Sequence, residues 1–116
     1  MIKFEDMVKS LAKPGETILA ELKSSDCHNL HMAMGATGEM GEVVDLIKKA
    51  IFYRKEIDRK ALIEELGDVE FYLEGIRQGF GISREAVINA NINKLGRRYS
   101  GFNYTDQAAI NRADKS

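Results

Sequence analysis

Hydrophobic residues recur at helical spacing through most of the chain. The clearest stretch carries apolar residues in alternating steps of four and three: Leu62, Leu66, Val69, Leu73, Ile76 and Phe80. Such steps place the side chains on one face of an α-helix. The spacing therefore predicts a helix that ends at Gly79-Phe80-Gly81, where glycine favours a helix stop.

A longer helix is predicted before it, from near Cys27 to about Phe52. Ser24-Ser25-Asp26 offers three residues suited to cap its start. Its apolar residues spread nearly all round the helix, so we expect a central, mostly buried element. The polar stretch 53–58 reads as the connection to the next helix.

Shorter helices complete the pattern. Ser83 is placed to cap a helix that runs to Tyr99, and Pro14-Gly15 separates a short N-terminal helix from one over 16–23. A further short helix is expected over 106–112. With no period-two alternation, the chain is predicted to be all-α, a bundle of four helices. We expect a single domain over 1–116, with an N-terminal helical segment (1–26), a helical core (27–99) and a polar tail (100–116).

Composition excludes several classes of protein. Seventeen Lys and Arg against eighteen Asp and Glu leave a net charge of -1, which gives no reason to expect binding of a nucleic acid polymer or an anionic membrane. The single cysteine, Cys27, excludes a disulfide framework and fits a reducing compartment. No apolar run approaches the roughly 20 residues that span a bilayer. We therefore expect a soluble cytoplasmic protein.

Two pairs of acidic residues stand three apart: Glu39 with Glu42, and Glu65 with Asp68. Either pair alone is typical of a solvated helix face. Two adjacent antiparallel helices, however, would bring the four carboxylates towards one pocket, where like charges need a cation. No histidine or cysteine shares the spacing, so hard oxygen ligands predict Mg²⁺, and iron is disfavoured.

Asn91, Lys94 and Arg98 form a polar stripe on the next predicted helix. An ordinary solvated surface explains this stripe when the helix is taken alone. Beside a metal-binding carboxylate cluster, Lys and Arg are what a polyphosphate ligand requires, because Arg binds phosphate bidentately and Lys adds a point charge.

Other residues carry weaker signals. Gly35, Gly38 and Gly41 each cost the long helix about 1 kcal/mol relative to alanine, which calls for close approach of a helix or a ligand. His28 and His31 are candidates for contact with a base, although capping or simple exposure also explains them.

Three motifs together resemble the MazG-like nucleotide pyrophosphohydrolases, a family of all-α nucleoside triphosphate pyrophosphatases. These motifs are Glu39-Met40-Gly41-Glu42, Glu64-Glu65-Leu66-Gly67-Asp68-Val69 and the segment 91–99, NINKLGRRY. The resemblance extends over about residues 28–112. It implies hydrolysis of a ribo- or deoxynucleoside triphosphate to the monophosphate and pyrophosphate, as house-cleaning of the nucleotide pool.

The resemblance also implies roles for individual residues. Mg²⁺, with Mn²⁺ as a substitute, would be held by Glu39, Glu42, Glu65 and Asp68, which are also the candidate catalytic residues. The phosphates would meet Lys94 and Arg98, with Asn91 and, more weakly, Lys48 nearby. The chain has no tryptophan. Stacking on the base would therefore fall to another ring, the candidates being Tyr72, His28, His31, Phe4 and Phe52.

The nearly all-round apolar helix also indicates self-association, as a homodimer or homotetramer. Two other functions stay open at this point. One is a non-catalytic helical oligomer that binds nucleotide or a protein partner and keeps a structural metal site. The other is a sensor of a nucleotide alarmone, since binding and hydrolysis would use the same residues.

Overall fold

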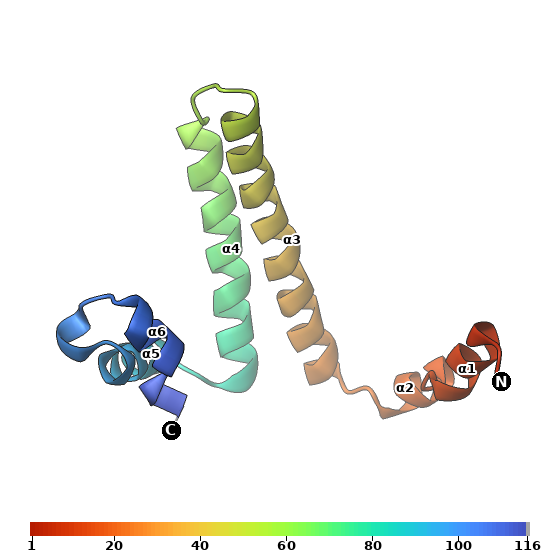
Figure 1. Ribbon diagram of the computed structural model, residues 1–116. Coiled ribbons are helices and arrows are strands. Elements are labelled where there is room, and N and C mark those ends of the chain that lie inside the picture. Colours follow the sequence, from red (N-terminus) through yellow and green to blue (C-terminus); the bar gives the residue numbers. More distant parts are fainter. Residues whose placement is uncertain (116) are drawn as a thin grey trace.

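A computed structural model describes residues 1–115 as a series of helices joined by short connections (Figure 1). Ser116, the last residue of the predicted tail, lies outside the described residues. The helices, in chain order, are α1 (Phe4–Leu11), α2 (Gly15–Glu21), α3 (Ser24–Phe52), α4 (Arg59–Phe80), α5 (Arg84–Arg98), η1 (Ser100–Phe102), α6 (Asp106–Asn111) and η2 (Ala113–Lys115). The predicted all-α class is confirmed, because no strand occurs in these 115 residues.

Local signals account for most helix ends. Asp58 accepts a hydrogen bond from the Ala61 amide (3.0 Å) at the start of α4, and Ser83 accepts one from the Ala86 amide (3.0 Å) at the start of α5. Gly81 ends α4 in the left-handed conformation, with φ +64°, which glycine adopts without strain. The cap of Ser83 and the stop near Gly81 are as predicted.

The start of α3 differs from the prediction. The helix begins at Ser24 rather than near Cys27, and Asp26 lies inside its first turn. The carboxylate of Asp26 reaches back to accept a hydrogen bond from the Lys23 amide at 2.9 Å. An acidic side chain in this position stabilises the first turn, and the helix begins three residues earlier than predicted.

Helices α3 and α4 form an antiparallel hairpin, which is the main packed unit of the chain (Figure 1). Its buried apolar side chains are Met32 and Val43 from α3 and Val69 from α4. The expectation of a mostly buried α3 is therefore wrong for the isolated chain, since only two of its 29 residues are buried.

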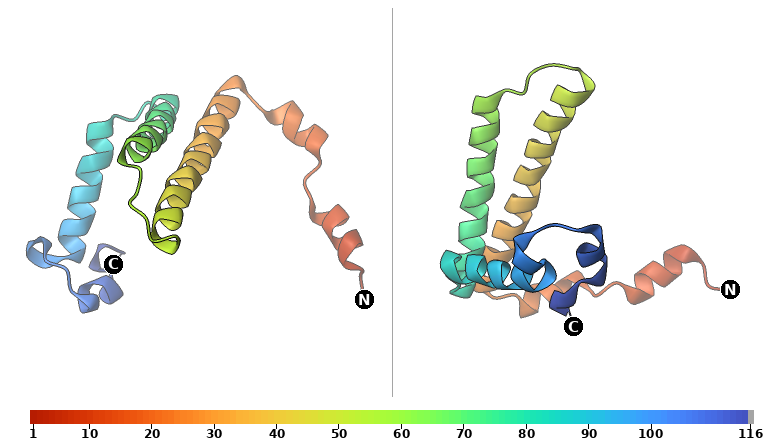
Figure 2. Two further views of the ribbon diagram at one scale, coloured as in Figure 1. Left: turned by 90° about the horizontal axis from the view of Figure 1, so that it is seen from above. Right: turned by 60° about the vertical axis from the view of Figure 1, so that its left-hand side comes forward.

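The four-helix bundle predicted for the chain does not form within residues 1–115. Helix α5 packs on η1, α6 and η2, while α1 and α2 extend away from the hairpin (Figures 1 and 2). The radius of gyration is 20.3 Å, against about 13 Å for a compact chain of this length. Two packed helices bury only the faces that they turn towards each other. Apolar side chains on the other faces therefore stay exposed, and Met34, Ile51 and Ile63 each keep 65% or more of their surface exposed.

Among residues 1–115, no helix combines the length and the apolar character needed to cross a bilayer.

Candidate functional site

Three acidic side chains meet midway along the hairpin. Glu39 of α3 and Glu65 and Asp68 of α4 each offer one carboxylate oxygen, and these oxygens lie within 4.8 Å of one another. Glu39 and Glu65 are half-buried, whereas Asp68 is exposed. The antiparallel pairing of the two helices thus brings together residues that are far apart in the sequence.

The three carboxylates affect one another's ionisation, and Glu65 is the residue that shows it. The pKa of Glu65 is raised, first because its carboxyl shares a hydrogen bond with that of Glu39, then through desolvation and the charges of Glu39 and Asp68. A carboxylate that resists ionisation beside two others is a position where a cation would be bound. Oxygen donors without nitrogen or sulfur suit Mg²⁺ or Mn²⁺. The donor set therefore fits the predicted metal.

Two of the predicted site residues lie outside this group. Glu42 is exposed one turn further along α3 and is not part of the three-carboxylate cluster. Lys48 lies closer to the connection between the helices, with its ammonium 3.8 Å from Asp45. Asp45 also pairs with Lys49 at 2.8 Å, and the pKa of Asp45 is lowered mainly by that hydrogen bond. Within this chain, neither Glu42 nor Lys48 joins the carboxylate cluster.

Tyr72 lies next to the carboxylates. It follows Asp68 by one turn of α4 and faces Gly35, which precedes Glu39 by one turn of α3. A Cβ at position 35 would overlap the Tyr72 ring. The missing side chain of Gly35 therefore lets the Tyr72 ring pack closely on α3 at this position, one turn of α4 from Asp68.

The neighbouring rings hold Tyr72 in place. Phe71 meets Tyr72 edge-to-face, with centroids 5.1 Å apart and planes at 86°, and His31 lies 6.2 Å away at 65°. Among the residues predicted to contact the base, Tyr72 is thus the one that lies one turn from Asp68. His31 contacts the ring of Tyr72.

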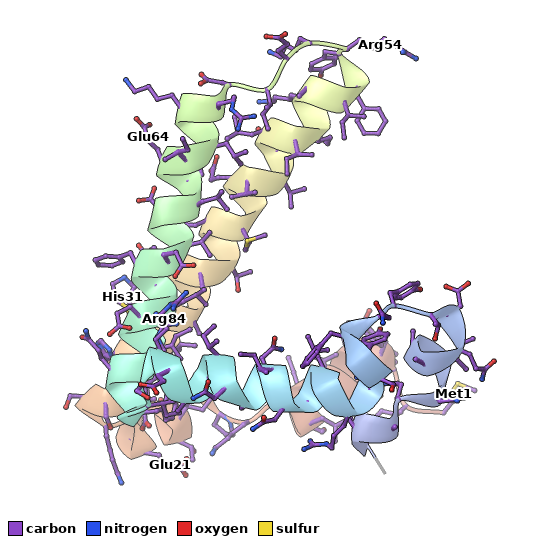
Figure 3. All side chains as sticks on the ribbon, turned by 90° about the vertical axis from the view of Figure 1, so that its left-hand side faces the viewer. Met1, Glu21, His31, Arg54, Glu64 and Arg84 are labelled. Carbon is purple, nitrogen blue, oxygen red and sulfur yellow. The ribbon has the colours of Figure 1, made fainter. Side chains whose placement is uncertain are left out.

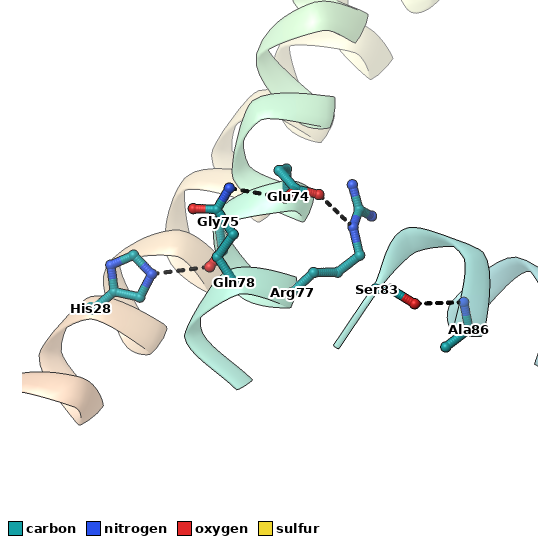
Figure 4. Close-up of polar contacts among 7 residues, drawn as sticks. All are labelled: His28, Glu74, Gly75, Arg77, Gln78, Ser83 and Ala86. Carbon is teal, nitrogen blue, oxygen red and sulfur yellow. Dashed lines mark hydrogen bonds and ion pairs between the residues drawn. The ribbon is translucent and has the colours of Figure 1, made fainter. Parts of the chain in front are cut away.

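His28 lies further from the carboxylates, near the foot of the hairpin (Figure 4). Its Nε2 lies 3.0 Å from the carbonyl oxygen of Gly75. Because a carbonyl only accepts, Nε2 must carry the proton and Nδ1 is left for another partner. Eleven residues separate His28 from Glu39, which is about 16 Å along the helix.

Two adjacent hollows surround His28. One, of about 460 Å³, is lined by Ser24, Ser25, His28, Asn29, Gln78 and Gly79. The other, of about 360 Å³, is lined by His28, Met32, Phe71, Glu74, Gly75 and Gln78. The carboxylate of Glu74 accepts hydrogen bonds from Gln78 and Arg77, both at 2.9 Å, and these bonds lower its pKa (Figure 4). Sequence analysis did not anticipate Glu74 or Gln78 here, since nothing in their spacing sets them apart.

The basic residues predicted to meet phosphate lie on α5, away from the carboxylates. Figure 3 shows α5 leaving the foot of the hairpin crosswise from its start at Arg84. Asn91 is exposed, and Lys94 is half-buried without an ion pair in residues 1–115. The structure therefore does not bring Asn91, Lys94 or Arg98 to Glu39, Glu65 and Asp68 within one chain.

Arg98 has a partner that sequence analysis missed. Its Nε and Nη2 donate to the two carboxylate oxygens of Asp114 at 2.6 and 3.0 Å. The Asp114 side chain has no exposed surface, and that of Arg98 is 17% exposed. This bidentate pair fastens η2 to the end of α5. A lone acidic residue in a polar tail carries no periodic signal that could have identified it.

We expect Asp114→Asn to loosen the C-terminal segment. The pKa of Asp114 is lowered by the hydrogen bonds from Arg98, so the pair stabilises the fold above the ordinary pKa of aspartate. That contribution is lost as the pH falls through the lowered folded value. At neutral pH the variant should show faster amide hydrogen exchange over residues 106–115 than the wild type. Glu85→Gln on α5 is the control, and equal exchange in all three proteins would contradict a fastening role.

Comparison with known proteins gives a family match. Residues 28–102 match the MazG nucleotide pyrophosphohydrolase domain family. The chain is also similar to the Gene 37 protein of Mycobacterium phage L5, with 29% identity over 83 residues, covering 65% of this chain and 73% of the phage protein. No solved structure matches the chain. The family match spans the acidic cluster, Tyr72 and the whole of α5.

Proposed function

Because the chain belongs to the MazG nucleotide pyrophosphohydrolase family, we propose that it hydrolyses a ribo- or deoxynucleoside triphosphate to the monophosphate and pyrophosphate. The observation that carries this proposal is the convergence of Glu39, Glu65 and Asp68 on one point of the hairpin. In the reaction, the oxygen of a water molecule bonds to the α-phosphorus. The bond to the oxygen that bridges the α- and β-phosphates breaks, and the proton of the water passes to solvent.

Glu39, Glu65 and Asp68 would hold Mg²⁺, or Mn²⁺ in its place. Bound there, the cation would offset the negative charge of the triphosphate and polarise its oxygens. Glu42 stays a proposed fourth ligand, one turn along α3 from Glu39. The raised pKa of Glu65 supports this assignment, because three carboxylates without a counter-charge oppose one another.

Other side chains would orient the nucleotide. The Tyr72 ring forms an apolar wall one turn from Asp68, where it can pack against the sugar or the base. His31 and His28 follow at increasing distance along α3 and offer ring nitrogens to a base. Lys94 and Arg98, with Asn91, are proposed to stabilise the charge that develops on the departing pyrophosphate.

Self-association is part of the proposal. The hairpin exposes apolar side chains that a second copy of the hairpin could cover, and two hairpins would together form a bundle of four helices. We propose a homodimer or a dimer of such dimers in the cytoplasm, acting to clean the nucleotide pool.

The test is pyrophosphate release from a panel of the four common ribonucleoside and four common deoxynucleoside triphosphates. Each reaction is run with Mg²⁺, with Mn²⁺ and with excess EDTA, and chromatography identifies the nucleotide product. We expect monophosphate only in the presence of metal. Tight nucleotide binding without turnover on any of the eight compounds would favour a non-catalytic binding protein.

A further inference from the structure

The smaller of the two hollows beside His28 lies within a nucleotide's reach of the acidic cluster. Met32 lines it from α3 and precedes Glu39 by seven residues. Gly75 lines it from α4 and follows Asp68 by seven residues, and seven residues of helix span about 10 Å, or two turns. In a nucleotide the sugar separates the α-phosphate from the base. A base can therefore enter the smaller hollow while its phosphates lie at the carboxylates.

The size and the apolar lining of the smaller hollow suit a flat ring. Its volume is about 360 Å³, which falls within the roughly 300–1,000 Å³ of small-molecule sites. Met32 and Phe71 give it apolar surface, on which an aromatic ring can pack. A Cβ at position 75 would overlap the Met32 side chain, so α3 and α4 approach each other closely here.

The polar groups around the smaller hollow offer mainly hydrogen-bond acceptors. The side-chain nitrogen of Gln78 donates to Glu74, so the amide oxygen of Gln78 is turned away from that carboxylate (Figure 4). His28 lies with Nε2 on the Gly75 carbonyl, which leaves Nδ1 of the neutral ring as an acceptor. The carboxylate of Glu74 has about four lone-pair sites, and Gln78 and Arg77 fill only two of them.

A buried acceptor in the larger hollow adds to this excess. Among residues 1–115, Oδ1 of Asn29 is buried and has no hydrogen-bond partner. Asn29 lines the hollow of about 460 Å³, which shares His28 and Gln78 with the smaller one. A buried acceptor without a donor costs free energy. The foot of the hairpin therefore favours a ligand that brings hydrogen-bond donors.

Guanine is the common base that brings the most donors on one edge. Its N1 hydrogen and its 2-amino group are adjacent, and together they match the two oxygens of a carboxylate. Adenine and cytosine offer one amino group beside an acceptor nitrogen. Uracil and thymine place their N3 hydrogen between two carbonyl oxygens, which acceptors on the protein repel.

We infer that the hollow between Met32 and Gly75 holds the base of the substrate and selects guanine, whose N1 hydrogen and 2-amino group the Glu74 carboxylate accepts. This inference rests on the proposed function and names the substrate class of that site. The Glu74 side chain is 48% exposed, so water competes with the base for the carboxylate and the preference is a moderate one.

The test compares dGTP with dITP, whose hypoxanthine base lacks only the 2-amino group of guanine, and with dTTP. The kcat/KM of the wild type is measured for each in the presence of Mg²⁺. We expect dGTP to exceed dITP by about 10-fold, the value of one hydrogen bond to a charged group, and to exceed dTTP by more. Equal kcat/KM for dGTP and dITP would overturn the inference and leave the proposed function standing.

A variant assigns the preference to its residue. Glu74→Gln should lower kcat/KM for dGTP by about 10-fold and leave that for dTTP unchanged, because glutamine offers only one acceptor oxygen. Glu70→Gln, one turn earlier on α4 and also exposed, is the matched control and should keep the wild-type ratio. An unchanged ratio of dGTP to dTTP in Glu74→Gln overturns the inference.

A binding measurement separates this inference from the proposed function. If the wild type hydrolyses no triphosphate, the proposed function fails, and the affinities for dGMP and dIMP are then compared by calorimetry. Tighter binding of dGMP, lost in Glu74→Gln and kept in Glu70→Gln, would support a guanine site without hydrolysis. Equal affinities for dGMP and dIMP would overturn it.

Discussion

Glu65→Gln is expected to raise the melting temperature of the metal-free protein and at the same time to abolish turnover. The two effects have one cause. The Glu65 carboxyl shares a hydrogen bond with Glu39 and is repelled by Glu39 and Asp68. Glutamine keeps the shape and donates that hydrogen bond without a charge, so the repulsion disappears. The same change removes a proposed metal ligand.

The pH dependence follows from the direction of the shift. Because the pKa of Glu65 is raised, the folded protein binds more protons than the unfolded chain above the ordinary pKa of glutamate. Stability therefore falls as the pH rises through the raised pKa, and the destabilisation is complete once the pH is above that raised pKa. The wild type should lose stability over this range relative to Glu65→Gln, which cannot titrate at this position.

Thermal unfolding and turnover are measured on the wild type, Glu65→Gln and the neighbouring control Glu64→Gln. In EDTA we expect the highest melting temperature for Glu65→Gln, whereas Mg²⁺ should raise that of the wild type more than that of the variant. Turnover should fall by at least about 100-fold, a loss that even outer-shell changes at metal sites can reach. Glu64→Gln should behave like the wild type. Equal turnover in all three proteins would remove Glu65 from the site.

Gly35→Ala is expected to destabilise the hairpin, although alanine is the better helix former. Alanine in place of glycine gains up to about 1 kcal/mol of helix propensity. Against this, the new methyl group overlaps the Tyr72 ring, which also makes edge-to-face contacts with Phe71 and His31. Overpacking of this kind costs about 1–3 kcal/mol. The overlap outweighs the propensity, so the melting temperature should fall.

Gly38→Ala is the matched control, one turn further along the same helix. A Cβ at position 38 meets nothing within 4 Å among residues 1–115, so only the gain in helix propensity applies and the melting temperature should rise. The double variant Gly35→Ala with Tyr72→Ala should recover part of the loss, which measures the coupling of the two positions. Melting temperatures that change in the same direction for Gly35→Ala and Gly38→Ala would show that the ring does not press on Gly35.

The helices themselves could be predicted because their signals are local. Apolar spacing located α4, and Ser83 and Gly81 marked ends that the structure confirms. The error at the start of α3 has the same origin, because Ser24, Ser25 and Asp26 are each acceptable near a helix start. All three lie inside the first turn, and the Asp26 carboxylate accepts a hydrogen bond from the amide of Lys23, the residue that precedes the helix.

The carboxylate cluster was predicted in part. An i, i+3 pair on each of two helices joined by a short connection must come together in an antiparallel hairpin, so the approach of Glu39, Glu65 and Asp68 could be expected. Which of the four carboxylates lies outside the cluster could not, because this depends on the rotation of each helix. Contacts such as Tyr72 on Gly35 set that rotation.

The sequence by itself determined the family, the helical class and the presence of acidic pairs on two adjacent helices, because periodicity, caps and motifs are properties of neighbouring residues. Only the tertiary structure decided that Arg98 is bound to Asp114 and that α5 leads away from the hairpin. These features depend on the direction of the chain at the turn after Gly81 and on contacts between distant segments. Small backbone rotations at such a turn move a whole helix, and no local sequence pattern encodes the direction in which that helix then runs.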